Sequence, residues 1–490
     1  MSEATRAKHR QPLFEQLTLA QRRWILFAVA VGTFMGPLDS SVVNIALPSI
    51  SAFYNVTLST VEWVVMSYLL VISSLLLTYG RMGDLYGHRK IYISGFAIFT
   101  IGSLLCAVSP TIAWLIIFRA LQAIGAGMMM SMGPAIITDI TPPRERGKSL
   151  GVVAVSVSVA LTAGPVLGGF LTNTFGWESV FLINIPIGIL AIILALKVIP
   201  PTGGDEAQPF DIAGSTLLFL ALISILYSLS NGQSMGWTNP LVIGLLAAGI
   251  VIMISFLFLE NKVKYPMLDL SLFKNKLYSM GNTSAMISYI AMFSVVLIMP
   301  FYLQDLLGYS PSKAGFFMIP MPLVTMIIAP IAGTVSDRVD TRYVSSLGLA
   351  INALALWLLA NLDPSSSIIS ITLALAVMGL GSGLFQTPNN SAVLGTVPPY
   401  RRGIASSMLA IMRNIGMVLG VAISGAIFSS RLDHLKESLA ASGLAGTALQ
   451  HQAFTGALHT TFIVAAAIAV IGVFASLVRG PLHEANKITD

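Results

Sequence analysis

Charged residues are scarce in this chain of 490 residues, because Asp, Glu, Lys and Arg together make up only 10% of it. About a quarter of the residues are charged in a typical soluble globular protein. Hydrophobic residues make up 55% of the chain, and the mean hydropathy is +0.82. This composition excludes a large water-soluble enzyme and predicts an all-α protein that crosses a membrane many times.

Cysteine and deeply placed histidine are also lacking. The single cysteine, Cys106, excludes a disulfide framework and a thiolate metal cluster. None of the six histidines lies deep in an apolar run, which argues against a metal site. No glycine-rich phosphate loop is present, so we expect no ATP use and no cofactor. The net charge of +6 lies in short clusters between apolar runs, a pattern that does not favour nucleic acid.

Fourteen apolar stretches approach the length of about 20 residues that a membrane-spanning helix needs. They cover residues 24–44, 62–80, 91–109, 112–137, 147–172, 178–199, 211–229, 240–259, 277–303, 314–334, 343–361, 367–392, 402–430 and 460–478. An even number of spans places both chain termini on the same side of the membrane.

The distribution of Lys and Arg indicates which side this is. Of the 27 such residues, 22 fall in the two terminal tails and the alternate loops on their side, and three fall on the other side. The remaining two, Arg119 and Arg413, lie inside spans. Since cytoplasmic loops are rich in Lys and Arg, we expect cytoplasmic termini and a retained, uncleaved N-terminal tail. The expected location is the plasma (inner) membrane of a prokaryote, with several passes.

Two motifs occur twice along the chain. The stretch Gly80-Arg-Met-Gly83-Asp84-Leu-Tyr-Gly87-His-Arg89-Lys90 returns in weaker form at 333–342, and Gly125-Ala-Gly127 returns at 381–383, at offsets of 253 and 256 residues. Two six-helix halves would need a shorter offset, so the seventh and eighth spans look like an insertion. The expected units are an N-tail at 1–23, a six-helix half at 24–199, two inserted helices with linkers at 200–276, a second half at 277–478 and a C-tail at 479–490.

In these motifs the chain resembles the major facilitator superfamily, and within it the fourteen-helix drug:proton antiporters. Four stretches carry the resemblance over nearly the whole chain: the loop motif at 80–90, Leu38 to Pro48 in the first span, Phe118 to Gly127 in the fourth, and Gly164-Pro165-Val-Leu-Gly168-Gly169 in the fifth. The resemblance implies transport by alternating access, and it implies that the fifth-span motif seals the cavity in one conformation.

Ionisable groups inside spans are costly and therefore mark functional candidates. Asp39 and Arg119 fall at similar depths in their spans, so we expect them to pair, with Asp39 as the proton-coupling carboxylate. A static structural pair is the alternative. Glu62 opens the second span and is either an interfacial residue in water or a second coupling carboxylate. The resembling family more often has an amide at this position.

Other polar and flexible side chains in the spans are candidates for substrate contact, although core packing or lipid contact is the alternative for each. They are Gln122, Met128, Gln386, Asn389 and Arg413. We further expect Gly80, Gly83, Asp84, Gly87 and Arg89 to form a latch that holds one transport state, with topological anchoring as the alternative.

These observations together predict a proton-coupled exporter of lipophilic, often cationic, compounds. Its partners would be protons, small lipophilic substrates and membrane lipids, without nucleic acid or ATP, and we expect a monomer. The alternative is an exporter or facilitator of one metabolite or antibiotic on the same scaffold. No loop reaches domain size and no hydrolytic pair of acids is present, so an enzyme is not expected.

Overall fold

The computed structural model describes residues 13–142, 145–201, 211–263, 270–336, 338–397 and 402–479, and none of these residues forms a strand. Within these ranges thirteen helices are long and apolar enough to cross a membrane, and a shorter apolar helix covers Ala213–Leu229. Each of the fourteen predicted spans therefore corresponds to an apolar helix, and the all-α prediction is confirmed.

The helices form two six-helix halves with two further helices between them in the chain. The first half consists of α2 (Leu19–Tyr54), α3 (Leu58–Val61) with α4 (Trp63–Tyr86), α5 (His88–Ala107), α6 (Ile112–Ile140), α7 (Arg146–Phe175), and α8 (Ser179–Leu182) with α9 (Asn184–Val198). The inserted pair is α10 (Ile212–Met235) and α11 (Pro240–Glu260). The second half consists of α12 (Lys276–Phe301) with η3 (Tyr302–Leu306), α13 (Pro311–Phe317) with α14 (Pro320–Ser336), α15 (Thr341–Ala360), α16 (Ile368–Gly395), α17 (Arg402–Ala441) and α18 (Gly446–Val478).

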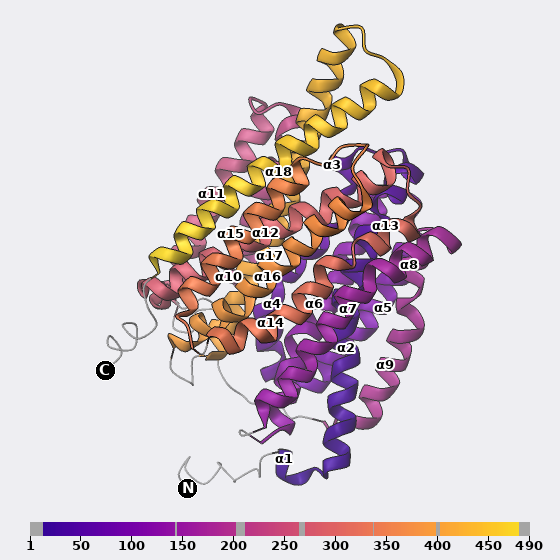
Figure 1. Ribbon diagram of the computed structural model, residues 1–490. Helices are drawn as coiled ribbons and strands as arrows, with labels where there is room; N and C mark the ends of the chain where they lie inside the picture. Colours follow the sequence, from indigo (N-terminus) through magenta and orange to yellow (C-terminus); the bar gives the residue numbers. More distant parts are fainter. Residues whose placement is uncertain are drawn as a thin grey trace.

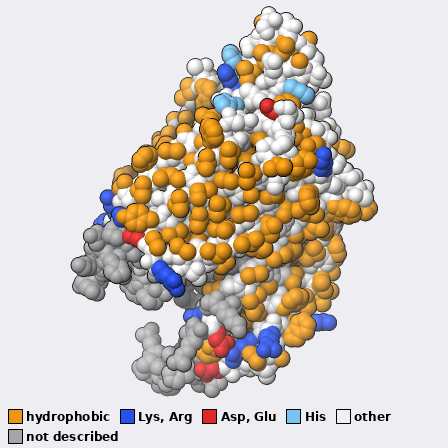
Figure 2. Space-filling view, in the orientation of Figure 1, with side chains coloured by type: hydrophobic (Ala, Val, Ile, Leu, Met, Phe, Trp, Pro, Cys, Tyr) orange, Lys and Arg blue, Asp and Glu red, His pale blue; other side chains and the backbone are white. Residues whose placement is uncertain are grey.

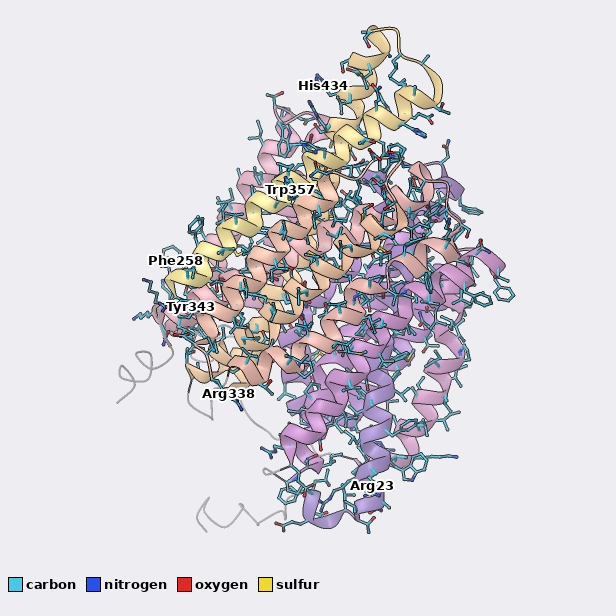
Figure 3. All side chains as sticks on the ribbon, in the orientation of Figure 1. Arg23, Phe258, Arg338, Tyr343, Trp357 and His434 are labelled. Atoms are coloured by element: carbon cyan, nitrogen blue, oxygen red, sulfur yellow. The ribbon has the colours of Figure 1, made fainter. Side chains whose placement is uncertain are left out.

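The two ends of the bundle differ. Helix α2 begins and α18 ends at one end, which we call the terminal end, while α17 and α18 project from the other end, which we call the hairpin end (Figure 1). Arg23 and Arg338 lie toward the terminal end, and His434 lies on the projecting hairpin (Figure 3). Between the ends the visible face is covered mostly by hydrophobic side chains (Figure 2), as expected for a surface in contact with lipid.

The internal repeat is visible in how the helices pack. In the first half, α5 and α6 approach so closely at Gly95 and Gly125 that a Cβ atom on either glycine would overlap the backbone of the other helix. In the second half, α15 and α16 do the same at Gly348 and Gly381. These residue pairs are separated by 253 and 256 positions, the same offsets as the repeated sequence motifs.

A second repeated contact joins the fifth helix of each half to the first. A Cβ atom on Gly168 of α7 would lie 2.7 Å from the Val42 carbonyl oxygen of α2, and one on Gly420 of α17 would lie 2.7 Å from the Ile290 oxygen of α12. Only glycine permits such contact between helix backbones. The repeat therefore includes a stretch of α17 that the sequence motifs did not identify.

The inserted helix α10 packs against α4 and α17. The hydroxyl groups of Thr78 on α4 and Ser215 on α10 are 2.8 Å apart, and the rings of Trp63 and Tyr227 are 5.8 Å apart. The insertion therefore contacts one helix from each half.

Candidate functional site

Asp39 lies in the interior of the first half, on α2, with only 1% of its surface exposed. A carboxylate that is removed from water needs a countercharge and hydrogen-bond donors to remain ionised. Three side chains donate to it: Arg119 Nη1 to Oδ2 at 2.6 Å, Gln122 Nε2 to Oδ1 at 2.9 Å, and Asn184 Nδ2 to Oδ1 at 2.7 Å. The structure thus brings Asp39 and Arg119 together within the first half.

Arg119 is itself fully buried and has further contacts on α4. Its Nε donates to the Val64 carbonyl oxygen at 3.1 Å, and its guanidinium carbon lies 4.1 Å from the centre of the Tyr68 ring. A cation over an aromatic ring is stabilised by the negative charge density of the ring face. Helix α4 therefore holds Arg119 in the orientation that presents Nη1 to Asp39.

Ser103 on α5 completes the group. Its hydroxyl oxygen accepts from Gln122 Nε2 at 3.2 Å and from Asn184 Nδ2 at 3.0 Å, and it donates to the Phe181 carbonyl oxygen at 2.9 Å. We call Asp39, Ser103, Arg119, Gln122 and Asn184 the Asp39 cluster. Its members come from α2, α5, α6 and the first residue of α9, so the cluster joins four helices of one half.

Asp39, Arg119 and Gln122 are predicted from the sequence, whereas Ser103 and Asn184 are not. Asn184 stands out in retrospect as the one amide within the apolar stretch at 180–187. Ser103 carries no comparable signal, because a hydroxyl group in a membrane helix can satisfy itself by bonding to its own backbone.

Glu62 is fully buried and not in water. It lies where α3 passes into α4, and its carboxylate is packed against Gly425 of α17, so that a Cβ atom on Gly425 would overlap it. Glu62 therefore lies at a contact between the two halves. Its role in proton coupling stays a prediction.

Helices α7 and α13 make a further contact between the halves at the hairpin end. A Cβ atom on Gly315 of α13 would lie 2.9 Å from the Pro165 carbonyl carbon, and one on Gly169 would lie 3.0 Å from the Pro311 carbonyl carbon. In addition, the Ser312 hydroxyl donates to the Gly169 carbonyl oxygen at 3.2 Å. We call this α7–α13 contact the glycine seam.

The fifth-span motif thus has two functions in packing. Gly164 and Gly168 face Ser41 and Val42 of α2, within the first half, while Pro165 and Gly169 face the second half across the glycine seam. The contact with α2 begins two residues after Asp39 in the chain.

The substrate candidates lie in different surroundings. Gln122 belongs to the Asp39 cluster, and Met128 is 8% exposed and packs on Gly95. Gln386 on α16 is partly exposed, as is Arg413 on α17, which hydrogen-bonds Tyr289 of α12. Their assignment to substrate binding stays a prediction.

Asn389, the fifth substrate candidate, is fully buried at the terminal end of the second half. Its Nδ2 donates to the Gly281 carbonyl oxygen at 3.0 Å, and its Oδ1 accepts from Arg479 Nη1 at 2.9 Å. Arg479 Nη2 also lies 3.3 Å from the Ser345 hydroxyl. Burial lowers the pKa of Arg479 to about 10, which still leaves it cationic at neutral pH. In this conformation the Asn389 amide is therefore hydrogen-bonded to the residue that directly follows α18.

The loop motif at the end of α4 forms a tight turn. Gly87 has a φ of +93°, which L side chains rarely adopt, and Gly83 lies directly against Met132 of α6. Gly80 faces the Ser131 hydroxyl at a Cβ distance of 3.4 Å. These glycines bring the α4–α5 turn close to α6.

The charged residues of the same motif are only partly described. The Asp84 side chain lies outside the described part of the structure, as does Asp337 in the weaker copy. Arg89 Nη2 donates to the Leu196 carbonyl oxygen at the end of α9, at 2.6 Å. The latch stays a prediction. Among the described residues, no group of three His, Cys, Asp or Glu side chains could hold a metal ion.

Two halves of six spanning helices, with a buried charged pair inside one half and close glycine contacts between halves, define a secondary transporter and not an enzyme. The chain belongs to the Major Facilitator Superfamily, whose sequence pattern it matches over residues 29–274 and 282–489.

Among its relatives, the riboflavin transporter RibZ of Clostridioides difficile (strain 630) is 37% identical, over 84% of this chain and 90% of that protein. The multidrug transporter protein MdtP of Bacillus subtilis (strain 168) is 31% identical, over 85% and 77%. A bacterial homologue of the human lysosomal transporter Spinster, solved in an inward-facing, unoccupied conformation, has a TM-score of 0.68 at 16% identity, covering 94% of this chain and 98% of that one. This last similarity supports the fold alone.

Proposed function

We propose that this chain exports small lipophilic, often cationic, compounds across a prokaryotic plasma membrane in exchange for protons. In this proposal the terminal end faces the cytoplasm, and the hairpin end faces outward. The relationship to MdtP, a multidrug transporter, supports export of varied compounds.

The observation that carries the proposal is the buried Asp39–Arg119 pair, because a carboxylate that is 1% exposed gains or loses a proton only with a change in its surroundings. Protonation of Asp39 cancels its charge and leaves the Arg119 cation without an ionised partner. The conformation that holds the pair intact is then disfavoured relative to one that hydrates or separates it.

A continuous set of contacts offers a route from this site to the contact between the halves. Ser41 and Val42 follow Asp39 on α2 and receive Gly164 and Gly168 of α7. The next face of α7 carries the glycine seam to α13. In our proposal a shift of α2 on protonation moves α7 and opens the glycine seam, while the loop motif from Gly80 to Arg89 holds one of the two states.

The second candidate is a transporter of one metabolite on the same scaffold. The identity of 37% to a riboflavin transporter favours a flavin or a similar planar heteroaromatic compound as the test substrate. The guanidinium of partly exposed Arg413 would donate to a ring carbonyl oxygen of such a compound.

The test uses purified protein in liposomes that contain a pH-sensitive dye. Riboflavin, lipophilic cations and neutral drugs are added in turn to wild type, Asp39→Asn and the control Asp363→Asn. Asp363 lies in the loop between α15 and α16, where bonds from Ser365 and Ser366 lower its pKa, so it stays ionised outside the spans.

Proton movement in response to several compounds, lost in Asp39→Asn and retained in Asp363→Asn, supports the multidrug antiporter. A response to riboflavin alone supports the second candidate. Substrate flux without proton movement would refute proton coupling, and equal proton movement in wild type and Asp39→Asn would refute the role of Asp39.

A further inference from the structure

Asn184 is bonded through only one end of its amide. Its Nδ2 donates to Asp39 Oδ1 at 2.7 Å and to the Ser103 hydroxyl at 3.0 Å, whereas its Oδ1 is buried without a hydrogen-bond partner. An unpaired carbonyl oxygen in a buried site is costly, and native structures contain few of them. Such an atom therefore needs an explanation.

The other donors to Asp39 have no comparable free acceptor. Gln122 uses both ends of its amide, because its Oε1 accepts from Arg119 Nη1 at 2.7 Å while its Nε2 donates to Asp39. Arg119 carries donors only. Asn184 is thus the amide in the Asp39 cluster that can present an oxygen to Asp39.

A proton on Asp39 would change what its Oδ1 can bind. As a carboxylate oxygen, Oδ1 accepts from both Gln122 and Asn184. As a hydroxyl oxygen it carries one hydrogen that must be donated, so one of the two amides must offer an acceptor instead. Since Gln122 is held at both ends, only Asn184 can do so, by turning its amide through about half a revolution about the Cβ–Cγ bond.

We propose that Asn184 is a positioning residue that adapts the site to both protonation states of Asp39, donating through Nδ2 to the carboxylate and accepting through Oδ1 from the carboxylic acid. The inference rests on the proposed proton coupling at Asp39. One amide atom of Asn184 lacks a partner in either orientation, and the Ser103 hydroxyl can accept from Nδ2 or donate to Oδ1. The charge of Asp39 then decides between the two orientations.

Helices α4, α5, α6 and α9 each contribute a group to this balance. The titratable groups within electrostatic reach are Arg119 on α6, Tyr68 on α4 and Cys106 on α5, while α9 contributes the neutral Asn184. Among these described residues, Arg119 is the cation that favours the carboxylate, and Asn184 is the group that can stabilise either form.

The experiment is infrared pH-difference spectroscopy on the full chain in lipid, which detects protonation without transport. The Asp39 carboxylic acid band is identified by its loss in Asp39→Asn, and asparagine side-chain bands are identified by ¹⁵N labelling. The variants are Asn184→Leu, of similar size but without hydrogen-bonding groups, and Asn184→Ala in case the larger side chain prevents folding. Cys106→Ala is the matched control, since Cys106 lies beside Gln122 and does not contact Asp39.

In wild type and Cys106→Ala we expect an asparagine band that changes together with the Asp39 band. In Asn184→Leu and Asn184→Ala that asparagine band should be absent. The titration midpoint of the Asp39 band should move up by about one pH unit in these variants. The reason is that the hydrogen bond from Asn184 stabilises the charged carboxylate more than its bond with the neutral acid stabilises the acid, and both bonds are lost.

Two outcomes would overturn this inference alone. One is an Asp39 band whose titration midpoint is the same in both Asn184 variants as in wild type. The other is a wild-type Asp39 band that titrates without any accompanying change in an asparagine band. The absence of any titrating Asp39 band would overturn both this inference and the proposed coupling role.

Discussion

Replacing Gly315 with alanine tests whether the glycine seam opens during transport. The added Cβ atom would lie 2.9 Å from the Pro165 carbonyl carbon and closer still to its oxygen, and both belong to backbone that cannot rotate away. Overpacking of this kind costs about 1–3 kcal/mol. If the seam exists only in the conformation described here, the cost falls on that conformation alone, and the equilibrium shifts about 5–150-fold toward the open one.

Spin labels provide the assay, because the single native cysteine is buried and introduced cysteines can be labelled selectively. Exposed Thr174 on α7 and Lys313 on α13 are suitable positions on opposite sides of the glycine seam. We expect the distance distribution of Gly315→Ala to gain a longer component. The control is Gly244→Ala on α11, where an added Cβ atom meets nothing within 4 Å.

An unchanged distance distribution in folded Gly315→Ala would refute the reasoning, because the clash would then have been absorbed without separating the two helices. A longer component in Gly244→Ala as well would show that the change is not specific to the glycine seam.

Three further results are expected. Arg119→Gln should lower the free energy of unfolding by about 3–5 kcal/mol, because it leaves the buried Asp39 carboxylate without a countercharge. Adding Asp39→Asn should raise the thermal unfolding temperature part of the way back to that of wild type, without restoring proton movement. Gly425→Ala should displace the Glu62 carboxylate and lengthen distances at the hairpin end as Gly315→Ala does; a distribution identical to wild type would show that this contact yields without opening. Arg479→Ala should cost about 1–3 kcal/mol, because it removes a charged donor from a buried amide, whereas a thermal unfolding temperature equal to that of wild type would show that this bond contributes nothing.

The helices and the charged pair could be predicted from the sequence for simple physical reasons. A span must be apolar and about 20 residues long, so its position follows from where long apolar stretches occur in the sequence. Depth along a span follows from residue number, which was enough to expect Asp39 beside Arg119. The second-half counterpart of the fifth-span motif was not found, because Gly416 and Gly420 lack the proline and paired glycines that mark the first copy.

The surroundings of neutral polar residues were much harder to predict. The depth of a residue in its span does not say which way its side chain points. The sequence therefore does not show whether Asn389 and Asn184 face a substrate or bond to other side chains inside the protein. The structure places both inside their halves, one bonded to the end of α18 and the other to Asp39. Glu62 shows the same limit, because its burial depends on Gly425, a residue 363 positions away in the chain.

The hairpin that α17 and α18 form outside the bundle is a suitable fusion site for imaging. Helix α17 has 40 residues, or about 60 Å at 1.5 Å per residue, roughly twice the thickness of the hydrocarbon core. Its outer part therefore extends beyond the membrane as a direct continuation of a spanning helix (Figure 1). A rigid domain fused at the hairpin tip near Gly443 would move as one body with the second half and would give this 52.1 kDa chain a recognisable feature for particle alignment in electron cryomicroscopy.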